Sequence, residues 1–296
     1  MNTSSSPRQA SGPALIKGYP VQRLAAFAAG DLGGNPAGVV LCDTLPEADI
    51  MQAIAAEVGY SETAFACPAA DAWRVRYFAP EIEVPFCGHA TIALGAALAT
   101  RHGDGVYPLQ TNHARISVEG RQHHGRLQAI LQSPPTRSEP APAGLVDASL
   151  ALFGYRQADL DPRLPPALAE GGARHLILAL ASRQRLADMR YNQAAGRDLM
   201  LAQGFATIAI VHAETAQRFH ARNPFASGGV YEDPATGAAA AALGGYLRDI
   251  QWPHGGAIDI FQGEDMGVPC HLHAQIAPEA GSSIRISGAV RKLPAA

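Results

Sequence analysis

Two apolar stretches of this chain, each introduced by a glycine, align with one another. Residues 87–98 read CGHATIALGAAL and residues 236–247 read TGAAAAALGGYL, which gives six identities in twelve positions. Upstream of each, two further pairs of segments align in the same order: residues 62–67 with 206–211, and residues 73–80 with 217–224. Shared alanine-rich composition is the alternative explanation for one such match, but three matches in order favour an internal duplication. We therefore expect two similar domains.

The two stretches also predict what lies at the centre of each domain. In residues 89–100 and 238–247, apolar side chains occur all round the helix rather than along one stripe, which is typical of a helix enclosed by protein. Around the first helix, the sequence predicts strands at residues 19–28, 37–42, 63–68 and 73–80, and a helix over 46–58 that stops at Gly59. The expected fold class is α/β (α+β), with each domain a curved or barrel-like set of strands around a central hydrophobic helix.

The chain divides near its middle, at a stretch rich in proline and small residues. Residues 134–148 have the composition of an interdomain linker. This places an N-terminal domain at residues 17–133 and a C-terminal domain at residues 149–296, whose last strand is free to return to the first domain. Residues 1–16 lack an apolar core long enough for a secretory signal, and we expect them to be a disordered leader.

Composition and charge narrow the possible functions. The 296 residues are 47% hydrophobic and carry a formal net charge of −3, which supplies neither a basic footprint for nucleic acid nor a polybasic membrane anchor. The longest weakly polar runs are far shorter than the roughly 20 residues that span a bilayer. The cysteines, Cys42, Cys67, Cys87 and Cys270, form no C-x-x-C pair. This predicts free thiols in a reducing compartment, the cytoplasm.

The start of each central helix is the expected place for a ligand. A buried helix begins with N–H groups that lack intrahelical partners and with a partial positive charge. If both helices begin at one cleft between the domains, CGH at 87–89 and TGA at 236–238 supply two sets of donors for a substrate carboxylate. The expected substrate-binding residues are Cys87, Gly88, Thr236, Gly237 and Ala238. The alternative for each glycine is a structural role in a tight entry to the helix.

Three side chains near these helix starts are candidates for catalysis. Glu62 lies in GYSETAF, among partly apolar neighbours that favour a raised carboxyl pKa, suited to proton transfer. Asp233 precedes the second helix in YEDPATG, and His89 lies at the start of the first. The alternatives are a solvated glutamate, an aspartate that forms a turn before proline, and a histidine satisfied in the core. Because Glu62 aligns with Ala206, an acid or base here acts from one domain only.

Five segments taken together resemble one protein family. They read GNPAGVVL, SETAF, FCGHAT, EDPATGAAAAAL and FQGEDMGVP, and they follow one another in order along the chain. These segments resemble the PhzF-like family, named for the isomerase of phenazine biosynthesis, from about Val21 to the C-terminus. The resemblance implies the fold of diaminopimelate epimerase, with two similar domains, a substrate cleft between them, frequent homodimers, and catalysis without a cofactor or metal.

The resemblance also implies roles for particular residues. Glu62 matches the family's general acid/base, which removes a proton from one carbon and returns it to another. His89 and Asp233 match residues that line the site, and Gly88 and Gly237 match helix-start positions near the substrate. This chain has Ala238 where many members have serine. A hydroxyl contact to the substrate is therefore missing, and the substrate need not be the phenazine precursor.

The leading hypothesis is a cofactor-independent isomerase of a small carboxylate-bearing metabolite, and two alternatives stay open. Racemases and epimerases of the same fold use two opposed cysteines, but here the pair would be Cys87 and Thr236, and a threonine hydroxyl is too weak an acid to replace a thiol. A protein that binds a metabolite without converting it is the second alternative.

One further pattern lies outside these motifs. His271 and His273, in CHLH at residues 270–273, would share one face of a strand. Two or three candidate ligands without another partner at a known spacing are a weak signal for a metal. The sequence alone therefore predicts a solvated strand end, and no metal site.

Overall fold

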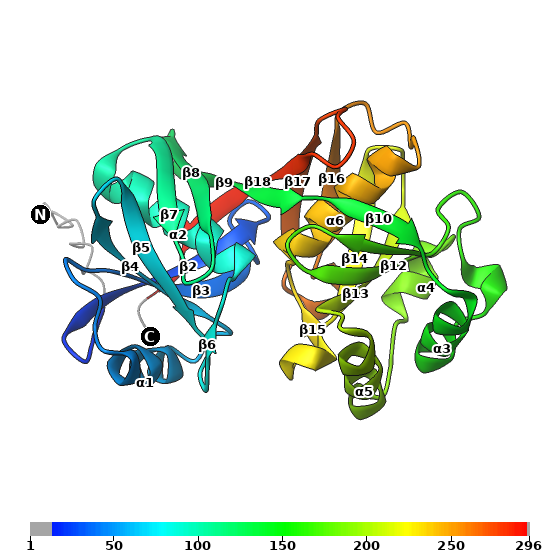
Figure 1. Ribbon diagram of the computed structural model, residues 1–296, viewed down its shortest axis with the longest axis horizontal. Coiled ribbons are helices and arrows are strands. Elements are labelled where there is room, and N and C mark those ends of the chain that lie inside the picture. The colour runs from blue at the N-terminus through cyan, green and yellow to red at the C-terminus, as the bar shows by residue number, and fades with distance from the viewer. Residues whose placement is uncertain (1–13, 295–296) are drawn as a thin grey trace, which may run out of the picture.

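The structure, a computed structural model, describes residues 14–294. Its elements form two lobes that lie side by side (Figure 1). The first lobe contains β1 (Ala14–Ile16), β2 (Tyr19–Ala28), β3 (Asn35–Leu41), α1 (Ala48–Val58), β4 (Thr63–Ala69), β5 (Ala72–Phe78), β6 (Glu83–Val84), α2 (Gly88–His102), β7 (Gly105–Gln110), β8 (Arg115–His123) and β9 (Arg126–Pro135).

The second lobe follows the same general plan. It contains β10 (Arg137–Pro140), α3 (Ala143–Phe153), η1 (Gln157–Asp159), β11 (Ala167–Glu170), β12 (Arg174–Ala179), α4 (Arg183–Ala187), α5 (Gln193–Gln203), β13 (Thr207–Ala213), β14 (Arg218–Pro224), η2 (Ala226–Gly228), β15 (Glu232–Asp233), α6 (Gly237–Asp249), β16 (Ala257–Gln262), η3 (Glu264–Met266), β17 (Cys270–Ile276) and β18 (Ser283–Lys292). The mixed α/β class predicted from the sequence is confirmed.

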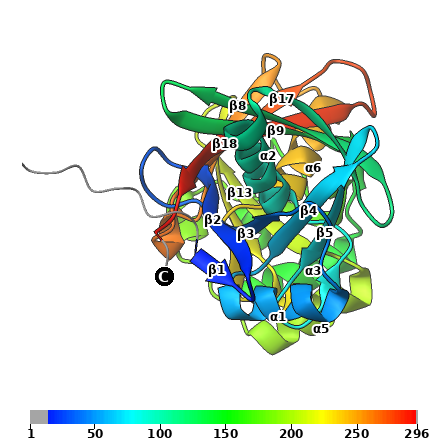
Figure 2. The same ribbon diagram turned by 90° about the vertical axis from the view of Figure 1, so that its left-hand side faces the viewer.

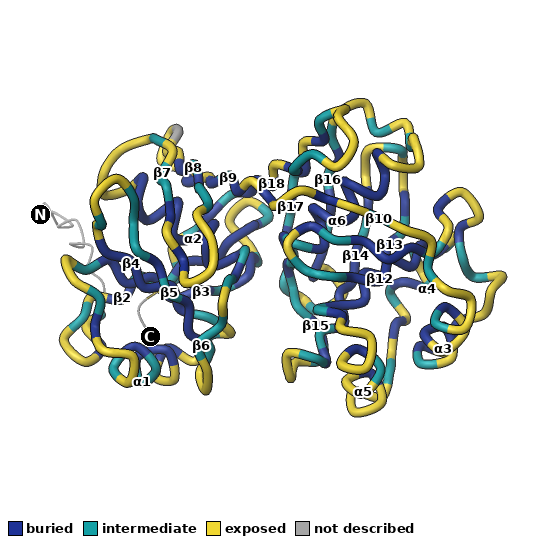
Figure 3. The backbone as a smooth tube through the Cα atoms, in the orientation of Figure 1, coloured by how far each residue is buried: buried dark blue, intermediate teal, exposed yellow. Residues whose placement is uncertain are grey.

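A largely buried helix lies at the centre of each lobe. Every residue of α2 from His89 to Ala99 is buried, and so is almost all of α6. Figure 2 shows α2 along its length with strands on several sides, and it packs against β2, β3, β8 and β9. The buried residues accordingly concentrate at the middle of each lobe (Figure 3). This is the arrangement that the absence of a polar stripe predicts.

The two lobes repeat a run of strand pairings. In the first, β3 pairs parallel with β4, β4 antiparallel with β5, and β5 antiparallel with β6. In the second, β12, β13, β14 and β15 pair in the same directions. The parallel pairs are connected through helices, α1 in the first lobe and α4 and α5 in the second, which pack on separate outer apolar clusters. The repeat seen in the sequence therefore corresponds to a repeated topology.

The last strand belongs to both lobes. Its first half pairs with β17 in the second lobe, from Ile284 to Ser287. Its second half, from Ala289 to Lys292, pairs with β2 in the first lobe, and β9 follows it along most of its length. The strand β18 thus makes one continuous sheet of the two lobes.

Two predicted segment boundaries differ from the structure. Residues 14–16, assigned to the leader, form β1 and pair with β2, while residues 1–13 lie outside the described part. Residues 134–148, expected to form a linker, contain the end of β9, all of β10 and the first half of α3. Proline is tolerated at strand ends and at helix starts, and Pro140 and Pro142 occupy such positions. Proline content therefore indicated the ends of elements here, and not a linker.

Two further observations concern the cysteines and the length of the helices. All four cysteines are free. Within residues 14–294, no helix is long and apolar enough to cross a bilayer.

Close approach between α2 and the sheet depends on glycine. A Cβ atom added to Gly120 of β8 would lie 2.1 Å from the carbonyl oxygen of Gly95 in α2. In the second lobe, a Cβ on Gly171 would lie 2.5 Å from the backbone nitrogen of Ala242 in α6. Because backbone atoms on both sides make these contacts, a side chain at either position must push a central helix away from its sheet.

We predict that Gly120→Ala lowers the free energy of unfolding by about 3 kcal/mol, because the added methyl group overpacks the contact with α2. Gly144→Ala is the matched control, since Gly144 lies in α3 with no atom within 4 Å of the added Cβ. The control should stabilise the protein by up to about 1 kcal/mol through helix propensity. Urea denaturation of both variants measures the difference. Equal stability of the two would show that α2 can move freely against β8.

Candidate active site

Both central helices begin at the glycines of the repeated motif. Helix α2 starts at Gly88 after Cys87, and α6 starts at Gly237 after Thr236. The preceding residues are extended, and neither donates or accepts a capping hydrogen bond through its side chain. The first turns of two buried helices therefore keep N–H groups that a ligand anion can satisfy.

A buried asparagine of the first lobe contacts the segment that leads into α6. Asn35, at the beginning of β3, donates its side-chain N–H groups to Oδ1 of Asp233 at 2.8 Å and to the carbonyl oxygen of Ala235 at 3.1 Å. Both acceptors lie in the segment that leads into α6. The first lobe thus holds the entry to the second lobe's central helix.

Glu62 lies beside the start of α2. It precedes β4 directly, and its Oε2 atom is 3.4 Å from Nε2 of His89. Ser61 places its hydroxyl oxygen 3.4 Å from the same nitrogen, and the Cys87 sulfur is 3.3 Å from Nδ1 of the ring. The side chains of His89 and Glu62 are 7% and 15% exposed. The glutamate is therefore sheltered but still reached by solvent.

Asp233 has both carboxylate oxygens bonded. Oδ1 accepts from Asn35, and Oδ2 accepts the Thr236 hydroxyl at 2.6 Å. Burial raises the pKa of the Asp233 carboxyl, while the His89 charge and the donors Thr236 and Asn35 oppose that rise. Because Asp233 lies within electrostatic range of His89 and Glu62, the structure brings the three predicted catalytic side chains into one site.

The predicted site residues all lie in or beside the two helix starts. They are Glu62, Cys87, Gly88 and His89 in the first lobe, and Asp233, Thr236, Gly237 and Ala238 in the second. Ala238 is half-buried in the first turn of α6, the position at which the resemblance predicted a missing hydroxyl.

A pair of arginine–glutamate bridges repeats across the lobes. Arg76 of β5 donates two hydrogen bonds to the carboxylate of Glu83 in β6, at 2.7 and 2.6 Å. Arg222 of β14 makes the same bidentate contact with Glu232 of β15. The sequence alignment placed Arg76 opposite His220, so the structural equivalence is shifted by two residues. The connection between β13 and β14 is two residues longer than the one between β4 and β5, which matches the shift.

Each glutamate of these bridges opens the same short pattern. Residues 83–88 read EVPFCG and residues 232–237 read EDPATG, so that glutamate, proline and glycine recur at the same spacing before each central helix. The bridge anchors the first residue of the turn that ends at the helix start. The repeat can be recognised in the sequence alone, and it extends the internal duplication to the residues of the candidate site.

Asn35 and Gln262 are site residues that the sequence analysis did not identify, although each lies in one of the segments that carry the family resemblance. Gln262, at the end of β16, donates to the carbonyl oxygen of Asp233 at 2.6 Å and to the Thr236 hydroxyl at 3.1 Å, and it accepts from the Thr236 N–H. With Asn35, it fixes the turn before α6. Both contacts join segments far apart in the sequence, and no local spacing predicts them.

One group of side chains at this site could hold a metal ion. Among residues 14–294, Glu62, Cys87 and His89 are the single group of three whose ligand atoms lie within 4.8 Å of one another. Glu62, however, approaches Nε2 of the imidazole and the thiol lies closer to Nδ1. Nε2 alone lies 3.4 Å from Glu62 and 4.0 Å from the Cys87 sulfur, so an ion here would have to be held through that nitrogen.

The Cys87 thiol is poorly suited to act as a base. Burial, followed by the charge of Glu62, raises the pKa of Cys87 well above its ordinary value. Thr236 occupies the equivalent position before α6 and donates its hydroxyl to Asp233. The structure therefore contains no second thiol opposite Cys87 at the described helix starts.

Comparison with known proteins gives the family. The sequence profile described as phenazine biosynthesis-like protein (PhzC-PhzF) matches residues 24–291. The chain belongs to this PhzF family. An uncharacterized isomerase of Mesorhizobium japonicum is 30% identical over 87% of this chain and 91% of its own length. The trans-2,3-dihydro-3-hydroxyanthranilate isomerase of Pseudomonas aeruginosa is 32% identical over 89% of this chain and 93% of its own length.

Solved structures of several proteins share the fold. A predicted epimerase from Pseudomonas aeruginosa superposes with a TM-score of 0.80, at 24% identity, over 93% of this chain and 96% of its own. A PhzF-family protein from Bacillus anthracis gives a TM-score of 0.79 with the same identity and coverage. A probable proline racemase from Agrobacterium radiobacter gives 0.63 at 12% identity, over 92% and 90%. The epimerase-like fold expected from the sequence is confirmed.

The repeated bridges predict unequal costs of mutation. Arg222 and Glu232 are 6% and 2% exposed, whereas Arg76 and Glu83 are 22% and 27% exposed. Glu232→Gln leaves a buried guanidinium without its counter-charge and should lower the free energy of unfolding by about 3–5 kcal/mol. Glu83→Gln should cost below about 1 kcal/mol, because solvent screens the pair. Urea titrations that rank the two variants in the opposite order would contradict this assignment.

The thiol chemistry predicts slow alkylation of Cys87. At about pH 7.5, iodoacetamide should modify Cys87 in the native protein about tenfold or more slowly than in the urea-unfolded chain, because the thiolate is disfavoured and the sulfur is buried. Peptide mass spectrometry over time measures the rate at each cysteine. Rapid native alkylation that a substrate prevents would instead support the cysteine-based racemase.

Proposed function

We propose that this chain is a cofactor-independent isomerase that moves a proton within a small carboxylate-bearing metabolite, with Glu62 as general acid/base. The observation that carries the proposal is the meeting of Glu62, His89 and Asp233 at two buried helix starts that lack side-chain caps. Family membership and relatives named as isomerases support the same reaction class.

The two carboxylates are bonded differently, which suggests different roles. Asp233 receives a donor on each oxygen at 2.8 and 2.6 Å, and these donors hold the carboxylate in place and favour its charged form. Glu62 faces His89 at 3.4 Å and lies in the connection before β4. We infer that Asp233 is a fixed acceptor that orients His89 or the substrate, and that Glu62 carries the proton.

The proposed step conserves atoms and electrons within the substrate. Glu62 accepts a proton from one carbon, the electron pair left behind shifts a double bond, and the protonated Glu62 returns the proton to a second carbon. The N–H groups at Gly88 and Gly237 hold the substrate carboxylate and stabilise the negative charge that develops next to it. No oxidant or reductant is consumed.

The substrate class follows from the site and from one relative. The N–H groups at two helix starts favour a substrate with a carboxylate. The name of the Pseudomonas aeruginosa relative contains one such compound, trans-2,3-dihydro-3-hydroxyanthranilate. Because Ala238 lacks a hydroxyl, the substrate need not be this compound. The homodimer and the cytoplasmic location also remain predictions, which light scattering and cell fractionation can check.

We predict that Glu62→Gln abolishes proton exchange, with loss of about a hundredfold or more in rate, because the amide cannot accept the substrate proton. The assay follows a panel of amino-acid and cyclic carboxylates in heavy water by NMR, with trans-2,3-dihydro-3-hydroxyanthranilate included. Glu57→Gln, which alters an exposed glutamate at the end of α1, should leave the rate unchanged.

Other outcomes would select the alternatives. Full turnover by a folded Glu62→Gln protein would refute the assignment of Glu62. Inversion of an amino-acid stereocentre that Cys87→Ser abolishes would identify a cysteine-based racemase. Tight binding in calorimetry with no exchange over hours would identify a binding protein.

A further inference from the structure

A cavity of about 500 Å³ lies where strands of the two lobes meet. Its wall is formed by β9, by the second half of β18 and by two residues of β17 from the second lobe. None of the candidate active-site residues lines it. A cavity of this volume is typical of sites for small molecules.

Basic side chains predominate among the charged groups of this cavity. Arg126, Arg291 and Lys292 line it, and among the described residues Asp31 is the one acidic residue that does so. The chain as a whole has a formal net charge of −3. The positive charge is therefore a local property of the cavity, and it would concentrate anions there although the rest of the protein does not attract them.

The two arginines are neighbours in the sheet. Leu127 of β9 pairs with Val290 of β18 in an antiparallel register, which places Arg126 next to Arg291. Because Leu127 and Val290 are buried in the core, and side chains alternate along a strand, both arginines lie on the outer face. Like charges at neighbouring cross-strand positions repel each other. An anion bound between them would remove this repulsion.

The described part of the chain does not compensate these charges. Within residues 14–294, neither Arg126 nor Lys292 forms an ion pair with an acidic side chain. Arg291 donates its Nε–H to the carbonyl oxygen of Gly33 at 2.8 Å, a partner without formal charge. Asp31 is exposed and forms no ion pair with the three cations.

The histidines of β17 already share the carboxylate that adjoins them. Nε2 of His271 and Nδ1 of His273 each lie 2.9 Å from Oδ1 of Asp259 on β16. Both histidines line the cavity, whereas Asp259 does not. This carboxylate therefore serves the histidines and leaves the arginines without a partner.

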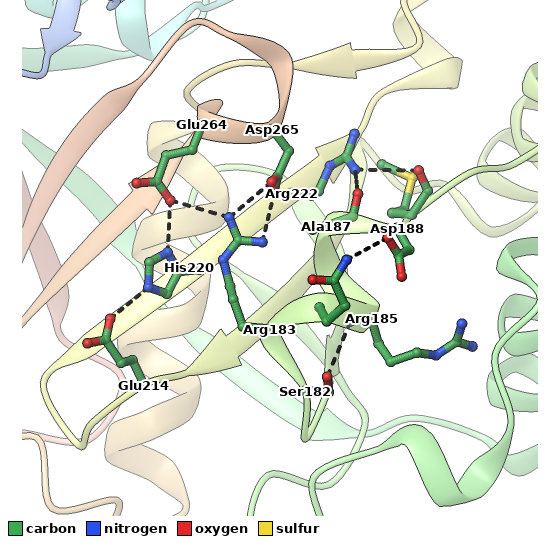
Figure 4. A network of polar contacts seen from close by, with 12 residues as sticks. Ser182, Arg183, Arg185, Ala187, Asp188, Glu214, His220, Arg222, Glu264 and Asp265 are labelled. Atoms are coloured by element: carbon green, nitrogen blue, oxygen red, sulfur yellow. Dashed lines mark hydrogen bonds and ion pairs between the residues drawn. The ribbon is translucent and has the colours of Figure 1, made fainter.

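A second polar cluster of the same lobe shows the contrast. In Figure 4, Arg183 contacts Glu264 and Asp265 at 3.5 and 3.0 Å. His220, in the same cluster, contacts Glu264 and Glu214 at 2.9 and 2.8 Å. The basic groups of that cluster are matched by acids of the chain itself and need no ligand.

We propose that the cavity binds one small oxyanion with two or more negative charges, held by Arg126, Arg291 and Lys292. Guanidinium groups bind carboxylate and phosphate groups through paired hydrogen bonds, which makes both groups suitable. The site uses no residue of the proposed isomerase machinery, so its test does not depend on the proposed function.

The experiment is calorimetric titration of the full chain with inorganic pyrophosphate and, separately, with citrate, at about 50 mM salt. At least one of them should bind with one anion per chain, and the ratio of their affinities tells whether phosphate or carboxylate groups are preferred. Arg126→Gln should weaken this binding about tenfold or more, because a charge-assisted contact is lost. Lys292→Gln should weaken it about threefold or more.

Arg285→Gln is the matched control, since it makes the same change in net charge on the same strand. Arg285 bonds Glu119 at 2.9 Å and does not line the cavity, so binding should be unchanged. As a second readout, the bound anion should slow the modification of Arg126 by phenylglyoxal, measured by peptide mass spectrometry. It should not affect Arg156, whose side chain is 82% exposed in the second lobe.

Three outcomes would overturn the proposal. The first is the absence of stoichiometric binding of both anions by the wild-type protein. The second is binding that Arg126→Gln and Lys292→Gln leave unchanged, which would locate the anion elsewhere, for example at the helix starts. The third is a change of oligomeric state in Arg126→Gln, seen by light scattering, with no anion bound by the wild type. That result would assign the cavity to a contact between two copies of the chain.

Discussion

The burial of two helices with no polar side constrains everything else in this fold. A helix such as α2, apolar all round from His89 to Ala99, can be stable in water only when protein surrounds it. The sheet must therefore wrap it, and small residues such as Gly95 and Gly120 let the sheet approach closely. The one part that cannot be filled by apolar side chains is the helix start, where unpaired N–H groups need polar partners. The same constraint that builds each lobe thus creates the polar helix start at which the proposed site lies.

The two helix starts are held relative to each other because the lobes are joined by more than a connecting chain. Strand β18 pairs with strands of both lobes. Opposite its register shift at Ala289 and Val290, the bulged residue Phe27 adopts a positive φ of 61°, which is strained for a bulky side chain. Its buried ring lies against Gly237 at the start of α6. Strain of this kind persists only where the surrounding packing holds the residue in that conformation. Here the same packing places the start of α6 against the first lobe.

The sequence predicted what depends on local pattern and missed what depends on distant pairing. The strand at 19–28, the helix stop at Gly59 and both central helices follow from periodicity, composition and glycine position, and the structure has them. The linker failed because proline marks the ends of elements as well as the gaps between them. Asn35, Gln262 and Asp259 were not identified, because each acts on a partner in another segment and the register that brings them together is set by the assembled sheet.

The fold alone does not decide the chemistry at this site. A probable proline racemase shares the architecture at 12% identity, so one scaffold carries more than one reaction. In this scaffold, the residue before each central helix stands at the meeting of the lobes, and a pair of thiols there would give two opposed bases. This chain has a buried Cys87, whose thiol pKa is raised well above its ordinary value, and Thr236, whose hydroxyl is engaged by Asp233. With both positions unsuited to proton transfer, the proposed acid/base is Glu62, and a single base on one side can move a proton along a substrate but is poorly placed to exchange it between faces.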